Sequence, residues 1–595
     1  MKTFIAICLL ALIMGCSSGS DSKGQDVTIA PTAQAVGSIT ATLKWGAIAK
    51  TSAKSVAAAP AGISTVRIIV SGSGISPSVQ KDFAAATGSG TIGDIPAGTG
   101  RTVIAQGLDV SGIVTYQGTA TNITVISGQT TDAGTITMVA GTGGTAVLGS
   151  FHGNIVLGSP TASSIMANVY APDQSGTVYI LYGTAPGFYE KQTSSSPLIA
   201  GKPVEIALQG LSADTRYYYR LYFQPSDGND SGPTEEYLFH TARPAGSTFT
   251  FSIQGDSHPE RAGQQFNSDL YRRTLLTAAA DQPDFYLTIG DDFSVDQLDP
   301  LTVTAAKVTE RYAIQRPYLG IIGSSAPVFL VNGNHEQAAR YLLNGTPNNV
   351  AVWAQNARNS YYSQPAPDNF YTGNSEVVPY IGLLRNHFAW TWGDALFVVI
   401  DPYWASATCV DDPFYGGAKR TNLWDVTHGD AQYQWLKTTL EQSKAKFKFV
   451  FAHHVMGTGR GGIELANLYE WGGQNNNRTW GFSANRPSWS APIHQLMAAN
   501  KVSIFFQGHD HIWAHQQIDG VTYQTLSEPA DPFYTLYNND AYLSGDKLPN
   551  TGYTRVTVSP SSVKVDYVRT YLPADEGQGK KSGSVAFSYS LPPSL

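Results

Sequence analysis

With 595 residues, the chain is long enough for about three or four domains, and its 59 glycines suit β-rich modules with many tight turns. The formal net charge is −7 and no run of lysine or arginine stands out, so the sequence lacks the basic footprint of a nucleic-acid-binding protein. Its three cysteines offer neither a disulfide framework nor a cysteine metal site.

The N-terminal 26 residues are typical of an export signal followed by a tether. Residues 4–14 form an apolar run that is too short for a permanent membrane span. Residues 13–16 resemble a bacterial lipobox, which implies removal of residues 1–15 and a lipid on Cys16, with residues 16–26 as a polar tether. The lipobox implies a lipid-anchored protein of the bacterial envelope. By resemblance to the way such lipoproteins are sorted, Ser17 rather than Asp after the cysteine favours the outer membrane, facing the periplasm or the surface. The alternative is an ordinary signal peptide with an incidental cysteine.

Two stretches of short β-prone runs follow the tether. Residues 27–140 contain alternating segments such as 39–45, with turn signals at intervals of about ten residues, which predicts a β-sandwich module. Residues 147–243 form a second stretch, and its tyrosine-rich passage at 208–222 resembles the fibronectin type III-like domain that precedes the catalytic domain of purple acid phosphatases. We therefore expect a second β-sandwich there.

Five apolar runs in the next region each end in residues that can bind metal. Open α/β sheets place their sites at such strand ends. A helical pattern at 264–280 separates the first two runs, which predicts a β-α-β unit with parallel strands. The blocks that follow the runs are Asp256-Ser257-His258, Gly290-Asp291-Asp292, Asn332-Gly333-Asn334-His335-Glu336, His453-His454 and Gly508-His509-Asp510-His511.

In order and in composition, these five blocks resemble those of the calcineurin-like metallophosphoesterases. The resemblance implies a layered α/β (α/β-β/α) metallophosphoesterase domain at 247–571, placed after the two β-sandwich modules and before a C-terminal tail at 572–595. It also implies two metal sites that share Asp291 as a bridge. The ligands would be Asp256, His258, Asp291 and His511 for one metal, and Asp291, Asn334, His453 and His509 for the other.

The ligand types fit hydrolytic metal chemistry. Nitrogen and oxygen ligands without thiolate suit two divalent or transition-metal ions such as Fe, Mn or Zn. Such a pair can supply a hydroxide nucleophile and neutralise charge on phosphoryl oxygens. A single strand-end aspartate is more often a turn former, and a single histidine is more often structural. Their joint occurrence in five ordered blocks favours the two-metal interpretation.

Three further residues are candidates for contacts with substrate. By the same resemblance, His335 contacts the phosphate or protonates the leaving oxygen, paired with a nearby aspartate; a structural histidine is the alternative. Arg460 and His515 are candidate phosphate contacts. Ser294 stands where purple acid phosphatases carry a metal-binding tyrosine, and His258 fills that ligand place instead, so a purple Fe(III) centre is not expected.

The favoured hypothesis is a surface-tethered phosphoesterase that hydrolyses phosphate esters by attack of metal-bound hydroxide. A phosphatase is favoured over a phosphodiesterase, and the expected partners are a phosphate-ester substrate and, through the lipid anchor, a membrane. The alternative is a cell-envelope binding or adhesion lipoprotein whose phosphoesterase-like domain is structural. The complete set of ligands favours the enzyme, because a degenerate site would usually have lost some of them.

Overall fold

The structure is a computed structural model that describes residues 35–45, 59–60, 63–72, 75–87, 90–108, 114–140, 151–226, 232–410, 422–455 and 459–594. The expected signal peptide, Cys16 and the tether lie outside these residues. The chain divides into two compact units, Met1–Thr145 and Ala146–Leu595. Among the described residues, we find no helix with the length and hydropathy needed to span a membrane.

The first unit is built from β-strands, as its alternating sequence predicts. Along β2, for example, Ile68 and Val70 point into the core while the residues between them are only half-buried, which is the period of a strand with one buried face. The strand order is β3-β2-β5-β6-β7-β1-β4. The strands are β1 (Val36–Trp45), β2 (Thr65–Gly72), β3 (Ile75–Ala84), β4 (Thr91–Pro96), β5 (Gly98–Leu108), β6 (Val114–Val125) and β7 (Thr130–Ala140).

The second unit begins with another β module, made of two sheets that enclose one apolar core. The tyrosine run lies on β14, where Tyr217 and Tyr219 are buried in this core and Tyr218 points the other way. One sheet contains β8 (Asn154–Gly158), β9 (Ser164–Tyr170) and β13 (Val204–Gln209). The other contains β10 (Gly176–Gly183), β11 (Lys191–Gln192), β12 (Ser196–Leu198), β14 (Arg216–Pro225), β15 (Gly232–Pro233) and β16 (Tyr237–His240).

A buried arginine connects this module to the rest of the unit. The Arg316 guanidinium donates hydrogen bonds to Asn154 Oδ1 and to Asn168 Oδ1, each at 2.7 Å, and also to the carbonyl of Tyr361. Burial lowers the pKa of Arg316 to about 10, so the group keeps its charge at neutral pH. Tyr219 of the module donates a further bond of 2.6 Å to the carbonyl of Ser324. The second β module is therefore packed directly on the domain that follows it.

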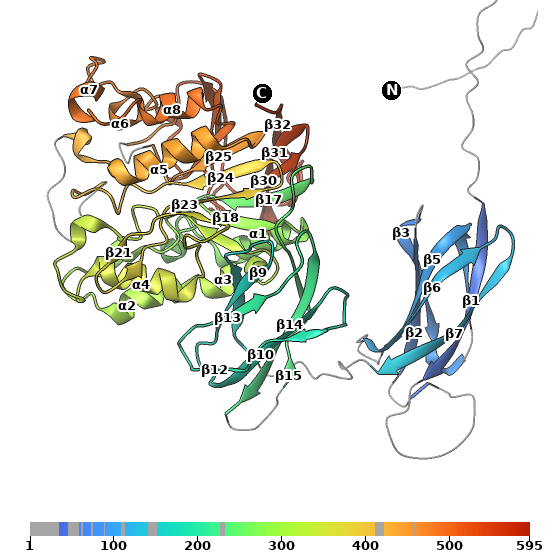
Figure 1. Cartoon of the computed structure of the whole chain (residues 1–595). Coiled ribbons are helices and arrows are strands. Elements are labelled where there is room, and N and C mark those ends of the chain that lie inside the picture. The colour runs from blue at the N-terminus through green and yellow to red at the C-terminus, as the bar shows by residue number, and fades with distance from the viewer. Residues whose placement is uncertain are drawn as a thin grey trace, which may run out of the picture. The chain divides into compact units, whose positions relative to one another are not determined.

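That domain contains two large sheets packed face to face (Figure 1). A small third sheet pairs β21 (Val377–Val378) with β22 (Gly382–Leu383). Between the two large sheets lies a core rich in phenylalanine, in which Phe251 contacts Phe285 and Phe397 at ring-centroid distances of 5.4 and 5.2 Å. The first sheet has the order β19 (Val328–Leu330), β18 (Phe285–Thr288), β17 (Phe249–Gln254), β30 (Gly552–Ser559), β31 (Ser562–Arg569), β32 (Val585–Leu591). The second has the order β20 (Thr372–Gly373), β23 (Phe388–Trp392), β24 (Ala395–Val399), β25 (Phe447–Phe451), β26 (Ile504–Gln507), β28 (Val521–Thr525), β27 (Trp513–Ile518), β29 (Asp546–Leu548).

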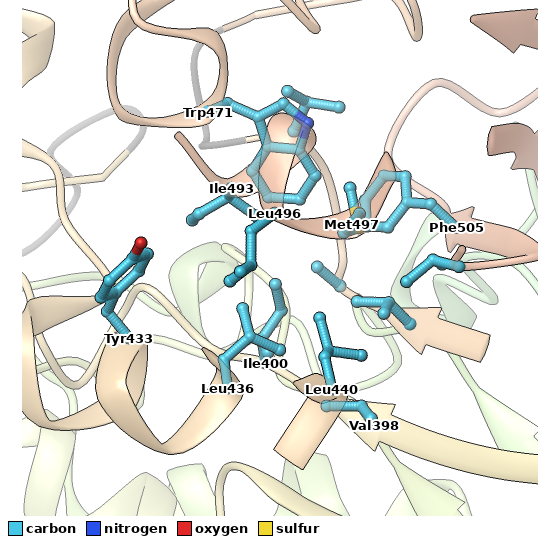
Figure 2. Packing of buried hydrophobic residues seen from close by; sticks show 14 of the residues in the cluster. Val398, Ile400, Tyr433, Leu436, Leu440, Trp471, Ile493, Leu496, Met497 and Phe505 are labelled. Atoms are coloured by element: carbon cyan, nitrogen blue, oxygen red, sulfur yellow. The ribbon is translucent and has the colours of Figure 1, made fainter. Parts of the chain in front are cut away.

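Helices cover the outer faces of both sheets, which completes the layered α/β architecture (Figure 1). Leu436 and Leu440 of one helix pack with Leu496, Met497 and Phe505 over the second sheet, as Figure 2 shows. The helices over the first sheet are α1 (Ser268–Ala280), α2 (Ala305–Ile314), α3 (Arg316–Gly323) and α4 (Val350–Tyr361). Those over the second are α5 (Gly429–Gln442), α6 (Tyr469–Gly472), α7 (Phe482–Asn485) and α8 (Ile493–Ala499).

Two details differ from the sequence expectation. Helix α1 starts at Ser268 and not at 264, because the Asn267 side chain accepts a hydrogen bond from Leu270 N and caps the first turn. It still connects β17 and β18, which are parallel as predicted. The stretch expected as a tail contributes β32, which pairs with β31 in antiparallel fashion, because its alternating sequence completes the edge of the first sheet.

Candidate metal centre

The predicted ligands lie just beyond the carboxyl ends of β17, β18, β19, β25 and β26. The first three strands are mutually parallel, and so are the last two, so each sheet brings its ligands to one edge. Strained backbone turns aim the side chains inward: the φ angles of His258, Asp291, His509 and His511 are 46°, 59°, 68° and 52°. Residues other than glycine rarely adopt this left-handed region, and they cluster there at functional sites.

One group of side chains, which we call the first ligand group, contains Asp256, His258 and His511. His511 Nε2 lies 3.1 Å from Asp256 Oδ2 and 3.3 Å from His258 Nε2. His258 Nε2 is 4.0 Å from the same Asp256 oxygen. All three residues are buried, and their donor atoms lie within 4.8 Å of one another, which is compact enough to hold a metal ion.

The second ligand group contains Asn334, His453 and His509. Asn334 Oδ1 lies 2.9 Å from His453 Nε2 and 3.1 Å from His509 Nδ1, and the two ring nitrogens are 3.3 Å apart. Asp291 adjoins this group, because its Oδ2 is 2.9 Å from His453 Nε2. Asp291, His453 and His509 form a second set of donor atoms within 4.8 Å of one another.

Asp291 also reaches toward the first group. Its carboxylate, His258 and His335 form a third set of donors within 4.8 Å. The backbone N–H of His335 donates to Asp291 Oδ1 at 2.9 Å and fixes the orientation of the carboxylate. Gly333 makes this approach possible, since a Cβ there would lie 2.3 Å from Asp291 Oδ1. The structure thus places Asp291 between the two groups, where the resemblance puts a bridging ligand.

The outer partners of the histidines test whether the site fits metal. Glu260 Oε1 lies 3.0 Å from His258 Nδ1, and Glu528 Oε1 lies 2.9 Å from His511 Nδ1. A carboxylate beside Nδ1 favours the tautomer with its proton there, so Nε2 faces inward and offers a lone pair once the imidazole is neutral. His453 follows the same rule with the carbonyl of Ile289 at 2.9 Å from its Nδ1. Inward lone pairs beside buried carboxylates are the donor set that a cation requires, and the residues fit the metals.

The same buried charges strongly raise the pKa values of two histidines. Burial disfavours the charged form of His453, but Asp291 and Asp256 more than offset it and raise the pKa of His453 to about 10. In the same way, Glu528 and Asp256 overcome the effect of burial and raise the pKa of His511 to about 10. Burial dominates at His258, whose pKa falls to about 4. Without metal, each ligand group therefore has one histidine that carries a second ring proton, and thus a positive charge, at neutral pH.

His335 lies beside the ligand groups with its ring fixed from behind. Its Nδ1 is 2.7 Å from Asp296 Oδ2, and its Nε2 faces inward, 3.7 Å from Asp291 Oδ2. Burial opposes the charged form, but Asp291 and Asp296 outweigh it and raise the pKa of His335 to about 9. The family resemblance implies an aspartate near this histidine, and Asp296 is in contact with it.

The remaining candidates lie elsewhere. The Arg460 guanidinium donates to the carbonyl of His509 and lies 3.3 Å from Asp510 Oδ1, so it supports the turn that carries the ligands. His515 is on β27, where its Nδ1 is 3.3 Å from Asp546 and its ring packs against Tyr589, tilted by 33° at a centroid distance of 4.2 Å. The role of His515 in phosphate binding stays a prediction, and these contacts give the ring a structural role on β27.

Sequence reasoning missed several residues that shape the site. Glu336 Oε1 accepts a hydrogen bond from Asp292 N at 2.9 Å, and its Oε2 accepts one from Gly333 N at 2.8 Å, which ties two ligand turns together. Glu260 and Asp296 were within reach of the motifs, only two and five residues from His258 and Asp291. Glu528 has no such signal, because it follows the separate strand β28.

Comparison with known proteins agrees with this geometry. Residues 249–513 match the calcineurin-like phosphoesterase family, and this part of the chain is a calcineurin-like phosphoesterase domain. A solved structure described as PhoD shares the fold, with a TM-score of 0.50 and 16% identity over 74% of this chain and 90% of that one. The purple acid phosphatase PPD1 of yellow lupin (Lupinus luteus) seeds gives a TM-score of 0.46 and 12% identity over 94% and 96% of the two chains. No curated protein matches the sequence.

Proposed function

We propose that the protein is a phosphatase that uses two metal ions to hydrolyse phosphate monoesters. The observation that carries the proposal is the convergence of the two ligand groups on Asp291, with His258, His511 and His453 each turned inward by an outer acceptor. Bound there, two ions supply a nucleophile at neutral pH and neutralise charge on the phosphoryl oxygens. A structural or adhesive domain has no need of such a donor set.

His335 supplies the proton in this proposal. Asp296 Oδ2 lies 2.7 Å from His335 Nδ1, and this ion pair holds the ring so that Nε2 faces the cluster. Without metal, Asp291 and Asp296 raise the pKa of His335 to about 9, and the contact with Asp296 supports the protonated ring directly. As the bond from phosphorus to the leaving oxygen breaks, that oxygen takes the proton, and one water is consumed to give phosphate and an alcohol. His335 then regains a proton from solvent.

The test compares leaving groups in a His335→Ala variant. We expect unchanged metal content and a roughly 10²–10⁴-fold loss of kcat on an alkyl phosphate, whose leaving oxygen needs a proton. The loss should be smaller for p-nitrophenyl phosphate, whose leaving group departs as an anion. His152→Ala, a change of an exposed histidine in the second β module, serves as the control. Metal-loaded wild-type protein that hydrolyses no phosphate ester would favour the adhesion alternative.

We also propose that the enzyme works at the bacterial envelope, tethered through a lipid on Cys16. The support is the sequence of residues 1–26 alone. Mass spectrometry of the mature protein should find a lipidated N-terminal Cys16, and Cys16→Ala should abolish partitioning into detergent without loss of esterase activity. A mature N-terminus at another residue, without lipid, would refute the tether.

A further inference from the structure

Arg261 is the one cation, among the described lysines and arginines, that lies against both His335 and the surroundings of the first ligand group. It follows His258 by three residues, in the short 3₁₀ turn η2 (Pro259–Arg261). Its Nη2 is 3.4 Å from His335 Nε2, the nitrogen that faces the cluster. About 23% of the Arg261 side chain is exposed, so this side chain reaches solvent beside the ligand groups.

The guanidinium is held in place by acceptors on its other edges. Its Nε lies 3.4 Å from Glu260 Oε1, and its Nη1 donates to Gln265 Oε1. Both acceptors also approach ligands: Glu260 lies 3.0 Å from His258 Nδ1, and Gln265 Nε2 lies 3.2 Å from His511 Nδ1. The position of the guanidinium is therefore set by the same residues that orient the first ligand group. A cation fixed in this way loses little side-chain entropy when it binds an anion.

From this arrangement we infer that Arg261 binds an unesterified oxygen of the substrate phosphate, next to His335. This inference rests on the proposed function and makes its substrate class specific. A phosphate monoester presents one more unesterified oxygen, and one more negative charge, than a diester. A fixed guanidinium beside the ligand groups matches that additional oxygen, because its N–H fork pairs with phosphate in a charge-assisted bond. Arg261 thus makes the site select terminal phosphates over diesters.

Arg460, the other arginine considered as a phosphate contact, cannot do the same. Arg460 donates to the carbonyl of His509 and pairs with Asp510, so its guanidinium bonds to the outer side of the ligand turn. Asp510 also accepts hydrogen bonds from Gly461 N at 2.7 Å and from Tyr542 Oη at 2.6 Å. It is therefore part of a buried hydrogen-bond network. Arg460 and Asp510 stabilise the backbone of His509, and neither one faces His335.

The experiment compares Arg261→Gln with wild type on two esters that share a leaving group, p-nitrophenyl phosphate and bis(p-nitrophenyl) phosphate. We expect kcat/KM for the monoester to fall by about 10²-fold, and that for the diester by less than about fivefold. Metal content should be unchanged. Arg261→Lys should recover part of the monoester rate, because it restores the charge without the fork. Arg272→Gln makes the same change of charge on the exposed side of α1 and is the matched control.

A second measurement makes the result independent of turnover. Calorimetric titration of the metal-loaded protein with inorganic phosphate should show binding weakened about tenfold or more in Arg261→Gln and unchanged in Arg272→Gln. Equal losses on both esters, loss of metal, or unchanged phosphate binding would each overturn the inference. If wild type hydrolyses neither ester, the proposed function fails, and the phosphate titration still decides whether Arg261 binds the anion.

Discussion

The two ligand groups differ in the charge of their ligands and of the acceptors behind their histidines. In the first group, buried carboxylates back both histidines, with Glu260 at 3.0 Å from His258 and Glu528 at 2.9 Å from His511. In the second group, His453 is backed by a neutral carbonyl. The first group also has its own anionic ligand, Asp256, where the second has the neutral amide of Asn334. Only Asp291 gives negative charge to both.

This difference predicts unequal metal sites. A carboxylate on the outer nitrogen makes an imidazole more basic and a better ligand. The first group therefore has the stronger electrostatic field, and we expect its ion to bind more tightly and to resist chelators longer. The second group should release its ion first. Three experiments test this asymmetry, from the largest expected effect to the smallest.

Removal of the shared carboxylate should eliminate the difference in metal affinity between the two groups, because both sites should then lose their ions. In Asp291→Ala, both groups lose their common anion, and we expect less than one bound ion per chain and a loss of activity of at least about 10⁴-fold. Elemental analysis and ester hydrolysis measure the two effects. Asp269→Ala, an exposed change in the first turn of α1, is the control. A variant that keeps two ions would show that Asp291 does not bridge.

Removal of one outer carboxylate should weaken only the first group. Glu528→Gln keeps an acceptor for His511 Nδ1 and loses the charge, so affinity for the first ion should fall by about 10–100-fold. Competition with a chelator measures both ions in one titration, and Glu310→Gln, on the exposed face of α2, is the matched control. Equal weakening of both ions would contradict the assignment of Glu528 to one group.

The smallest expected effect is a change in metal affinity of about tenfold per pH unit. It should be the same in both ligand groups. Without metal, the pKa values of His511 and His453 are each raised to about 10, so each histidine holds a proton at neutral pH that a metal ion must displace. Affinity should therefore rise with pH and level off as the pH approaches about 10. Calorimetry at pH 7 in buffers of different ionisation enthalpy should show about one proton released per ion. Affinities that stay flat from pH 6 to 8 would contradict this.

The ligands could be predicted because their signals are local. An apolar run followed at once by Asp, Asn or His identifies a strand and its end in the same few residues, and parallel strands bring such ends to one edge. The helix before β18 could likewise be predicted from the spacing of its apolar residues. Its exact start depended on the cap at Asn267. The first β module followed from the same short-range periodicity, whereas the second module and the layered α/β class were implied by resemblance to known families.

What the sequence could not show depends on pairing between distant segments. Glu528 contacts His511 from just beyond the end of β28, and nothing in the sequence around Glu528 distinguishes it from a surface glutamate. The pairing of β32 with β31 depends on a sheet edge that the sequence does not reveal. For the converse reason, closeness in sequence does not place His515 beside His511, since the alternation along β27 turns its ring toward Tyr589.

Arg316 has a consequence for how this enzyme could have been assembled from parts. Modular proteins exchange domains most readily where few contacts cross the boundary. Here the cation lies on α3, and its acceptors Asn154 and Asn168 lie on the β module before it. A recombination that replaced this module would leave a buried charge without those bonds, each worth about 1.5–3 kcal/mol. The β module and the phosphoesterase domain should therefore be inherited together, as one evolutionary unit.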